Sequence, residues 1–314
     1  MTFTTEQLIS DLYSQTDTDP HQLQDPDVAH LTINGNKVLG MHAVPGLNIE
    51  VTELDDGVKA VMTLDEDTEI AKPVHLCFGM IPKTGIQRII MDVTIGARSK
   101  IALQAHCVFP FAVDVQHIMD AVIRIKDGAK YSYFERHVHS PFGGVKVYPK
   151  ARVEVGKKAL FKTEFELIKG RVGLIDIDYE TFCDAEGVVD MMARVSGRGD
   201  DRIKISETAH LNGEHARGVL TSKIAVRDTA QAEVYNKLTA SAAYARGHVD
   251  CKEILQDQGA ATAVPIVDVR HPKAHVTHEA AIGSVDNKQL ETLMSRGLSE
   301  DDAVEAIING LLSH

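Results

Sequence analysis

Residues 88–95 have the sequence RIIMDVTI, in which apolar and polar side chains tend to alternate and β-branched residues are frequent. Similar runs occur at residues 144–148 (GVKVY), 161–168 (FKTEFELI) and 202–206 (RIKIS). A period of two, interrupted by Gly, Asn and Asp, is typical of short β-strands joined by turns. We therefore predict a mainly β protein from about residue 30 to 280, without the helical periods that a βαβ protein needs.

Short sequence elements recur within this region. The intervals separate Gly96 from Gly128 (32 residues), Gly128 from Gly156 (28), Thr208 from Thr229 (21) and Leu220 from Leu238 (18). Repeats of about 20–30 residues that each contain one or more strands indicate the coils of a parallel β-helix. A β-sandwich also has many short strands, but an aromatic content of 5% with no Trp favours a narrow core of small apolar side chains.

The N-terminal end is predicted to be helical. Residues 4–15 have an amphipathic pattern, with Thr4 and Gln7 at the positions of a capping box. The polar residues 16–27 that follow are expected to form a linker. The Ala-rich residues 229–245 are ambiguous and also fit a helix.

Two further short helices are predicted at the C-terminal end. Asp286 is expected to cap the first, which Gly297 ends, and Ser299 is expected to cap the second, whose first turn is acidic. The apolar face of the second helix consists of Val304, Ile307, Ile308 and Leu311. The predicted parts are an N-terminal helix and linker (1–27), a parallel β-helix core (28–284) and a C-terminal helical segment (285–314).

The composition is that of a globular protein. The 314 residues are 44% hydrophobic and 25% charged, with a net charge of −12, and residues 1–75 hold 14 acids but only three lysines. This negative charge disfavours nucleic-acid binding. No signal peptide or apolar run of membrane-spanning length is visible, and the four cysteines have no CxxC spacing. We therefore expect a cytoplasmic protein with reduced thiols and no membrane partner.

Possible metal ligands are densest near the end of the β region. They are His248, Cys251, His271, His275, His278 and Glu279. A cation such as His248 or Lys252 near Cys251 is expected to lower the pKa of the thiol and to favour the reactive thiolate. The alternative is a half-buried structural cysteine.

The spacing of the last of these residues limits how they can act together. On a strand, His275 and Glu279 share one face and His278 lies on the other, so a regular strand cannot direct all three at one ion. The pair His278-Glu279 is not followed by the second His of an HExxH zinc motif. The alternative is a solvated strand edge.

Other histidines give weaker signals. His137 and His139 share a strand face, which is compatible with metal binding but is more common as a surface pair. His106 and Cys107 are expected to alternate across a strand and to act separately. The sequence has no P-loop, no GxGxxG after a strand and no GxSxG, so nucleotide binding by this chain alone is not expected.

Residues 271–312 resemble the C-terminal signature of the SufB/SufD family, the scaffold proteins of the SUF system for iron–sulfur cluster assembly. The matching residues are His278-Glu279-Ala280, Gly283, Asp286, Leu290, Ser295-Arg296-Gly297-Leu298, Ala303 and Gly310. A weaker resemblance extends over residues 85–280. It implies a right-handed parallel β-helix followed by a helical C-terminal part, in agreement with the strand pattern.

The resemblance also implies site residues. SufB-type members have a cysteine on a late strand and a Glu in a His-Glu-Ala sequence, and Cys251 and Glu279 occupy these places. Residues 283–286 are more similar to the SufD pattern, and the SufD histidine implicated at the subunit interface falls at His278. The implied roles are Cys251 as sulfur acceptor and cluster ligand, Glu279 as an oxygen ligand, and His278 as a ligand or interface residue.

The resemblance further implies a cargo and partners. The cargo is a transient iron–sulfur cluster, and the partners are a sulfur donor and a SufC-type ABC ATPase that docks on the C-terminal helices. The chain is similar to a compact SufB-like member without the N-terminal multi-cysteine motif, for which a homodimer is expected rather than a SufB–SufD heterodimer. We expect a scaffold and not an enzyme. The alternatives are a SufD-like adaptor that binds the ATPase but no cluster, and a polysaccharide-cleaving β-helix enzyme, which the absence of Trp and of clustered acids disfavours.

Overall fold

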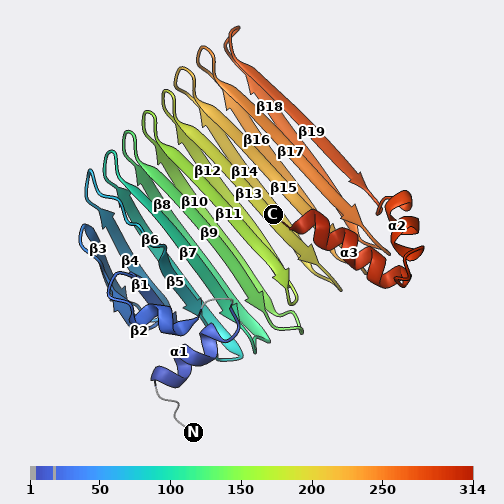
Figure 1. The fold of residues 1–314 in the computed structure, drawn as a ribbon, viewed down its shortest axis with the longest axis horizontal. Coiled ribbons are helices and arrows are strands. Elements are labelled where there is room, and N and C mark those ends of the chain that lie inside the picture. The colour runs from blue at the N-terminus through green and yellow to red at the C-terminus, as the bar shows by residue number, and fades with distance from the viewer. Residues whose placement is uncertain (1–4, 17–18, 314) are drawn as a thin grey trace.

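The computed structural model describes residues 5–16 and 19–313 and shows two long β-sheets that face each other, with helices at both ends (Figure 1). Sheet A has ten strands in the order β19-β17-β15-β13-β11-β9-β7-β5-β1-β2. Their bounds are β1 (His30–Asn34), β2 (Lys37–His42), β5 (Val74–Gly79), β7 (Lys100–Phe109), β9 (Lys130–His139), β11 (Leu160–Lys169), β13 (Val188–Gly197), β15 (Arg217–Val226), β17 (Arg246–Leu255) and β19 (His275–Gly283).

Sheet B has nine strands in the order β18-β16-β14-β12-β10-β8-β6-β4-β3. Their bounds are β3 (Leu47–Glu53), β4 (Gly57–Leu64), β6 (Thr84–Ile95), β8 (Asp114–Ile125), β10 (Val145–Val155), β12 (Leu174–Cys183), β14 (Arg202–Leu211), β16 (Gln231–Ala240) and β18 (Ala260–Val269). Among the described strands, only β1–β2 and β3–β4, in the acidic N-terminal quarter, pair antiparallel, and they form one end of the solenoid.

The parallel strands form coils, each with one strand of sheet B followed by one strand of sheet A, from β4–β5 to β18–β19. Arg246 is in register with Arg217 and with His275, which lie at equal intervals before and after it in the sequence. The predicted parallel β-helix is therefore confirmed, and the two intervals between glycines bracket its period. The two shorter intervals, between threonines and between leucines, were wrong as repeats, because they join positions that are not in register. Residues 229–245, which also fitted a helix, contain β16 and a turn.

The core lies between the two sheets because alternate side chains of each strand project inward. In β14, Ile203, Ile205 and Ala209 are buried, whereas Lys204 is exposed. Val, Ile, Leu and Ala make up most of this core, as expected from the low aromatic content. Removal of their apolar surface from water is the main source of stability.

The coil corners impose an unusual backbone conformation. Asp67, Arg98, Lys158, Glu186, His215 and Tyr244 all have φ between 56° and 59°, and Gly128 takes the same place in its coil with φ 72°. A non-glycine residue in this left-handed region is disfavoured by about 1–2 kcal/mol. The corner geometry therefore overrides local preference at six corners that lead from sheet B to sheet A, and Asp228 and Asp257 do so at two corners that lead from sheet A to sheet B.

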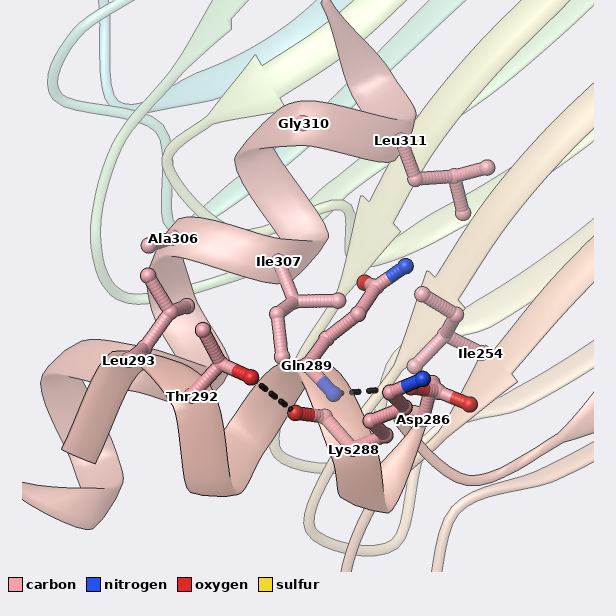
Figure 2. Close-up of a pocket in the computed structure, with 10 residues that line it drawn as sticks. All are labelled: Ile254, Asp286, Lys288, Gln289, Thr292, Leu293, Ala306, Ile307, Gly310 and Leu311. Atoms are coloured by element: carbon pink, nitrogen blue, oxygen red, sulfur yellow. Dashed lines mark hydrogen bonds between the residues drawn. The ribbon is translucent and has the colours of Figure 1, made fainter. Parts of the chain in front are cut away.

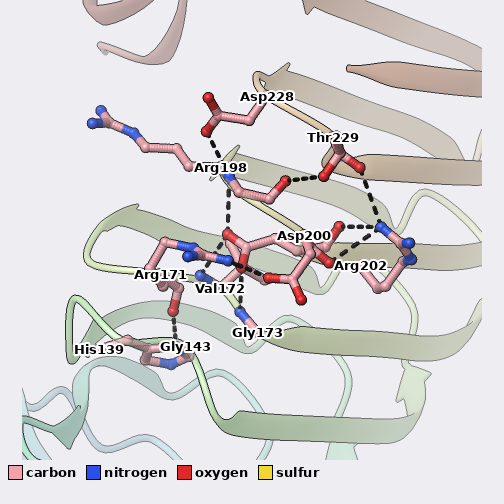
Figure 3. Close-up of polar contacts among 12 residues, drawn as sticks. His139, Gly143, Arg171, Val172, Gly173, Arg198, Asp200, Arg202, Asp228 and Thr229 are labelled. Atoms are coloured by element: carbon pink, nitrogen blue, oxygen red, sulfur yellow. Dashed lines mark hydrogen bonds and ion pairs between the residues drawn. The ribbon is translucent and has the colours of Figure 1, made fainter. Parts of the chain in front are cut away.

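A buried carboxylate holds two neighbouring turns that lead from sheet A to sheet B, at residues 170–173 and 198–201. Asp201 is fully buried and accepts hydrogen bonds from the backbone N–H groups of Val172, Gly173 and Arg198. The Arg171 guanidinium also pairs with Asp201 at 2.9 Å, and the Arg171 carbonyl accepts a hydrogen bond from His139 (Figure 3). This network ties successive coils together at one side of the solenoid.

The helices cover the outer face of sheet A at its two ends (Figure 1). They are α1 (Thr5–Tyr13), the 3-10 helix η1 (Pro20–Gln24), α2 (Asn287–Met294) and α3 (Glu300–Leu312). The predicted caps of the C-terminal helices are confirmed: Asp286 accepts from the Gln289 N–H and Ser299 from the Asp302 N–H. Thr4, the predicted cap of α1, lies outside the described residues, and the predicted linker contains η1.

Candidate functional site

The predicted site residues lie at the C-terminal end of the solenoid. β19 is the last strand of sheet A, and its residues are exposed or half-buried. In the pairing with β17, Cys251 is in register with Ala280, Val249 with His278 and Asp250 with Glu279. The structure therefore places Cys251, His278 and Glu279 on two neighbouring strands.

The register also decides which way these side chains project. Neighbours in register in a parallel sheet project to the same side, and Val249 and Cys251 belong to the core. His278 thus projects to the interior side, where no later coil covers it, and Glu279 projects to the outer face with Asp250. The sequence predicts that His278 and Glu279 lie on opposite faces of a strand, and the register agrees with this prediction.

The surroundings of Cys251 differ from the prediction of a nearby cation. Lys252 pairs with Asp250 at 3.0 Å, and His248 contacts Thr277, all on the outer side of β17 and β19. The Cys251 thiol is fully buried, and this burial raises its pKa instead of lowering it.

Three polar residues beside Cys251 were missed. Asn236 on β16 donates to Cys251 Sγ at 3.7 Å, and Glu253 lies two residues further on the same inward face of β17. Ser222 donates to Glu253 Oε1 at 3.5 Å, and burial raises the pKa of Glu253 to about 7. The i, i+2 spacing of residues 251 and 253 was the signal that points to Glu253.

Glu207 is an inward-facing carboxyl in the same interior. It is in register with Tyr179 on one side and Asn236 on the other. Its Oε2 has no hydrogen-bond partner in the described part of the chain, and burial raises its pKa from 4.5 to about 8. Glu207 therefore holds its proton at a pH where an exposed carboxyl is ionised.

We expect Glu207→Gln to remove a pH dependence of stability. Because the pKa is higher in the folded than in the unfolded chain, the wild-type free energy of unfolding falls as pH rises from about 4.5 to about 8, by up to about 1.4 kcal/mol per pH unit. The variant should gain stability relative to the wild type over that range. Urea unfolding at pH 5 and pH 9 measures this, with the exposed Glu154→Gln as control. Parallel pH profiles of Glu207→Gln and wild type would contradict the assignment.

A second group of possible ligands is buried near the N-terminal end. Cys107 on β7, His117 on β8 and His137 on β9 each place a ligand atom within 4.8 Å of the others. His137 and His139 are buried, so the surface pair expected from the sequence is wrong. The expected alternation of His106 and Cys107 is confirmed. Cys107 faces the main core, whereas Val108, which shares a strand face with His106, lies under α1 on the outer side of β7.

The protonation of this group follows from burial. Burial lowers the pKa of His117 and of His139 to about 3, and it raises that of the Cys107 thiol well above its usual value. Burial also acts to raise the pKa of Glu135, but the hydrogen bond and charge of His137 outweigh it, so that pKa lies below its usual value. The group therefore combines neutral imidazoles at His117 and His139, a neutral Cys107 thiol and an ionised Glu135 carboxylate.

Comparison with known proteins agrees with this architecture. Residues 92–311 match the family model described as "SUF system FeS cluster assembly, SufBD core domain". An iron–sulfur cluster assembly SufBD family protein of Methanocaldococcus jannaschii is 36% identical over 282 residues, which cover 90% of this chain and 89% of that protein. Similar proteins of Pyrococcus horikoshii are 33% identical (91% of this chain, 87% of the relative) and 27% identical (79% and 55%).

The chain belongs to the SufBD family of iron–sulfur cluster assembly proteins, as the C-terminal sequence signature predicted. None of the helices in the described part of the chain has the length and apolar character needed to cross a lipid bilayer.

Proposed function

We propose that the chain works in the cytoplasm as a SufB-like scaffold, on which an iron–sulfur cluster is assembled and from which it is transferred. The observation that carries this proposal is the position of Cys251. Its thiol lies one strand from the open end of the solenoid, with His278 on the same side of the neighbouring strand. The cluster is the cargo of this protein and not a resident cofactor, and the role requires no catalysed reaction of a small substrate.

The donor types suit a cargo that must be released. A permanent cluster is held by four thiolates. The proposed set has one thiolate from Cys251, an imidazole from His278 and a carboxylate from Glu279, and oxygen is a harder, less suitable ligand for such a cluster. The Cys251 thiolate first attacks the outer sulfur of a persulfide on a donor protein, so that an S–S bond forms at Cys251, the donor's S–S bond breaks and the donor cysteine leaves as its thiolate.

The opposite directions of Cys251 and Glu279 support a two-chain site. One chain does not direct both side chains to the same side of sheet A. β18 and β19 are the last strands of their sheets and leave one row of backbone groups unpaired, as edge strands do. We infer that a second copy meets this edge, and that both copies contribute Cys251, His278 and Glu279 to the interface.

The C-terminal segment offers a docking surface for a SufC-type ATPase. A groove of about 850 Å³ lies between α2, α3 and Ile254 of β17 (Figure 2). Leu293, Ile307 and Leu311 give it apolar walls, and α2 has no buried residue. This exposed apolar groove is suited to a partner protein.

The burial of Cys251 favours a second candidate, a SufD-like adaptor that binds the ATPase but no cluster. A buried thiol with a raised pKa is a poor sulfur acceptor. The scaffold role therefore requires that a partner or a change at the open end expose Cys251. The two candidates differ in whether iron and sulfide are bound.

The test is anaerobic co-purification of the full chain with a SufC-type ATPase and a sulfur donor, followed by iron and sulfide analysis and Mössbauer spectroscopy. We expect both elements in near-equal amounts with cluster absorbance in the visible range. Retention of the ATPase without iron or sulfide would instead establish the adaptor.

The same preparation tests the groove. Thr292→Arg places a long charged side chain in it and should weaken ATPase retention on the order of 100-fold if the groove is the centre of the interface. Asn309→Arg, on an exposed position of α3 outside the groove lining, is the matched control. Equal retention by both variants would place the ATPase elsewhere.

A further inference from the structure

Three metal-binding side chains meet inside the N-terminal half of the solenoid, several coils from Cys251. Cys107 and His137 are in register on β7 and β9 of sheet A. His117 comes from β8 of sheet B. One ligand atom of each lies within 4.8 Å of the other two, and all three side chains are buried.

Gln87 fixes the tautomer of His117. Gln87 Nε2 donates to the backbone carbonyls of Gly35 and Gly79 at 2.9 and 2.8 Å, so Gln87 Oε1 accepts from His117 Nδ1 at 3.0 Å. Because Nδ1 carries the proton of this neutral ring, Nε2 presents a lone pair toward Cys107 Sγ, 3.7 Å away. An N–H held by an outer partner, which leaves the other ring nitrogen available, is the usual arrangement of a metal-binding histidine.

His139 orients His137 in the same manner. His139 Nδ1 donates to the Arg171 carbonyl at 3.0 Å, so His139 Nε2 accepts from His137 Nδ1 at 3.2 Å. His137 Nε2 is therefore the nitrogen turned toward Glu135 Oε1, at 2.6 Å. Two imidazoles thus have one nitrogen each held from behind and the other directed at the thiol–carboxylate group.

The two distances from Cys107 Sγ match those of a tetrahedral metal site. With metal–sulfur bonds of about 2.3 Å and metal–nitrogen or metal–oxygen bonds of about 2.0–2.1 Å, tetrahedral ligand atoms S and N, or S and O, lie about 3.6 Å apart. Cys107 Sγ is 3.7 Å from His117 Nε2 and 3.6 Å from Glu135 Oε1. These two pairs need little movement to enclose an ion, whereas His137 Nε2 and Glu135 Oε1, now 2.6 Å apart, must separate to about 3.3 Å.

The charges balance for a divalent ion. Glu135 supplies one negative charge, and Cys107 supplies a second when it loses its proton on metal binding. The second oxygen of Glu135, Oε2, is buried and makes no hydrogen bond within the described residues. The Tyr133 hydroxyl lies close enough to affect the pKa of Glu135. A neutral ion–ligand group is tolerated in an apolar core, where an unpaired charge is not.

Aromatic rings enclose the group. The Phe109 ring centroid lies 5.1 Å from that of His117 and 5.4 Å from that of His139, and Phe165 lies 4.8 Å from His137. Such a shell keeps water from the group and leaves no open position for a substrate. The arrangement is that of a structural site and not of a catalytic one.

We propose that Cys107, His117 and His137 bind one Zn²⁺ or Fe²⁺ ion inside the solenoid, with Glu135 as the fourth ligand. The ion cross-links sheet B to sheet A and stabilises the N-terminal coils. This site does not depend on the proposed scaffold role, because none of its residues is near Cys251.

Cobalt tests the site through its spectrum. The full chain is expressed in minimal medium with Co²⁺ as the added metal and purified anaerobically. We expect one Co²⁺ per chain, the visible bands of tetrahedral cobalt and a thiolate-to-cobalt charge-transfer band. Expression with Zn²⁺ and Fe²⁺, followed by elemental analysis, then shows which ion the site retains.

Substitutions show which residues produce the cobalt charge-transfer band. Cys107→Ser should lose the charge-transfer band, and Gln87→Leu should weaken metal binding about 10–100-fold through His117. Cys77→Ser, a buried cysteine under α1, and Cys251→Ser should keep both band and stoichiometry. The Cys251 control separates this site from the proposed cluster site.

The proposal would be overturned by a wild-type cobalt content that is a small fraction of one per chain, by a band that survives Cys107→Ser, or by a band lost in Cys251→Ser. Inorganic sulfide that accompanies iron and depends on Cys107 would also overturn it, because it indicates a cluster and not a single ion. If Cys107→Ser does not fold, X-ray absorption at the cobalt edge is measured on cobalt-loaded Cys251→Ser to count the sulfur neighbours of the ion. One sulfur neighbour with imidazoles supports the site, and no sulfur contradicts it.

Discussion

Cys251→Ala is expected to abolish cluster retention by the anaerobically reconstituted chain, measured as inorganic sulfide and the iron that accompanies it, while the fold remains intact. Cys251 is the only one of the four cysteines in the last two coils, since Cys77, Cys107 and Cys183 lie on β5, β7 and β12. Removal of a buried thiol costs about 1–2 kcal/mol of stability, which a folded solenoid tolerates. Iron and sulfide per chain, together with circular dichroism, measure the two effects separately.

Cys183→Ala is the matched control, because Cys183 is equally buried but lies on the other sheet. It should retain iron and sulfide at the wild-type level. Unchanged iron and sulfide in Cys251→Ala would contradict the proposed role of Cys251. Equal loss in both variants would show that stability, and not ligation, limits retention.

The largest expected effect on stability comes from Arg194→Ala. Arg194 on β13 is 1% exposed, and its guanidinium pairs with Glu164 and Glu166 of β11 and donates to the Leu312 carbonyl at the end of α3. Removal of the guanidinium takes away one positive charge that two largely buried carboxylates share. Glu166 still pairs with Arg136, but the two carboxylates together then have one arginine instead of two. Breaking a buried ion pair in this way costs about 3–5 kcal/mol.

At about 2–4 °C per kcal/mol for a chain somewhat smaller than this one, we expect the melting temperature to fall by about 10 °C. Hydrogen exchange should also show loss of protection in α3, whose end Arg194 anchors to sheet A. Arg152→Ala, which removes an exposed arginine that pairs with Glu180, should change stability by less than about 1 kcal/mol. A melting temperature of Arg194→Ala within the error of that control would show that the pair has no net stabilising role.

The local structure was largely predictable from the sequence, because strands and caps depend on neighbouring residues. The alternation in residues 88–95 lies in β6, and Asp286 and Ser299 cap the helices as expected. Residues 229–245 were ambiguous, because Ala suits a helix by propensity, whereas here it fits the narrow interior of the solenoid.

The sites were less predictable, because they depend on register. Cys107 and His137 become neighbours only when β7 and β9, which are separated in the sequence by a whole strand of the other sheet, are aligned, and His117 joins them from that sheet. The approximate period found in the sequence was too imprecise for this, since a slip of one residue exchanges the two faces of a strand. By contrast, alternation along β17 alone places Lys252 on the opposite face from Cys251, so the predicted nearby cation could have been excluded from the sequence.

The constant interval that links Arg217, Arg246 and His275 bears on how such a chain can change in length. Duplication or deletion of one whole interval keeps every downstream side chain on its original face. An insertion of one residue within a strand instead turns the rest of that strand inside out. We therefore expect length differences between relatives to be whole coils or to be confined to the corners, where extra residues extend into solvent.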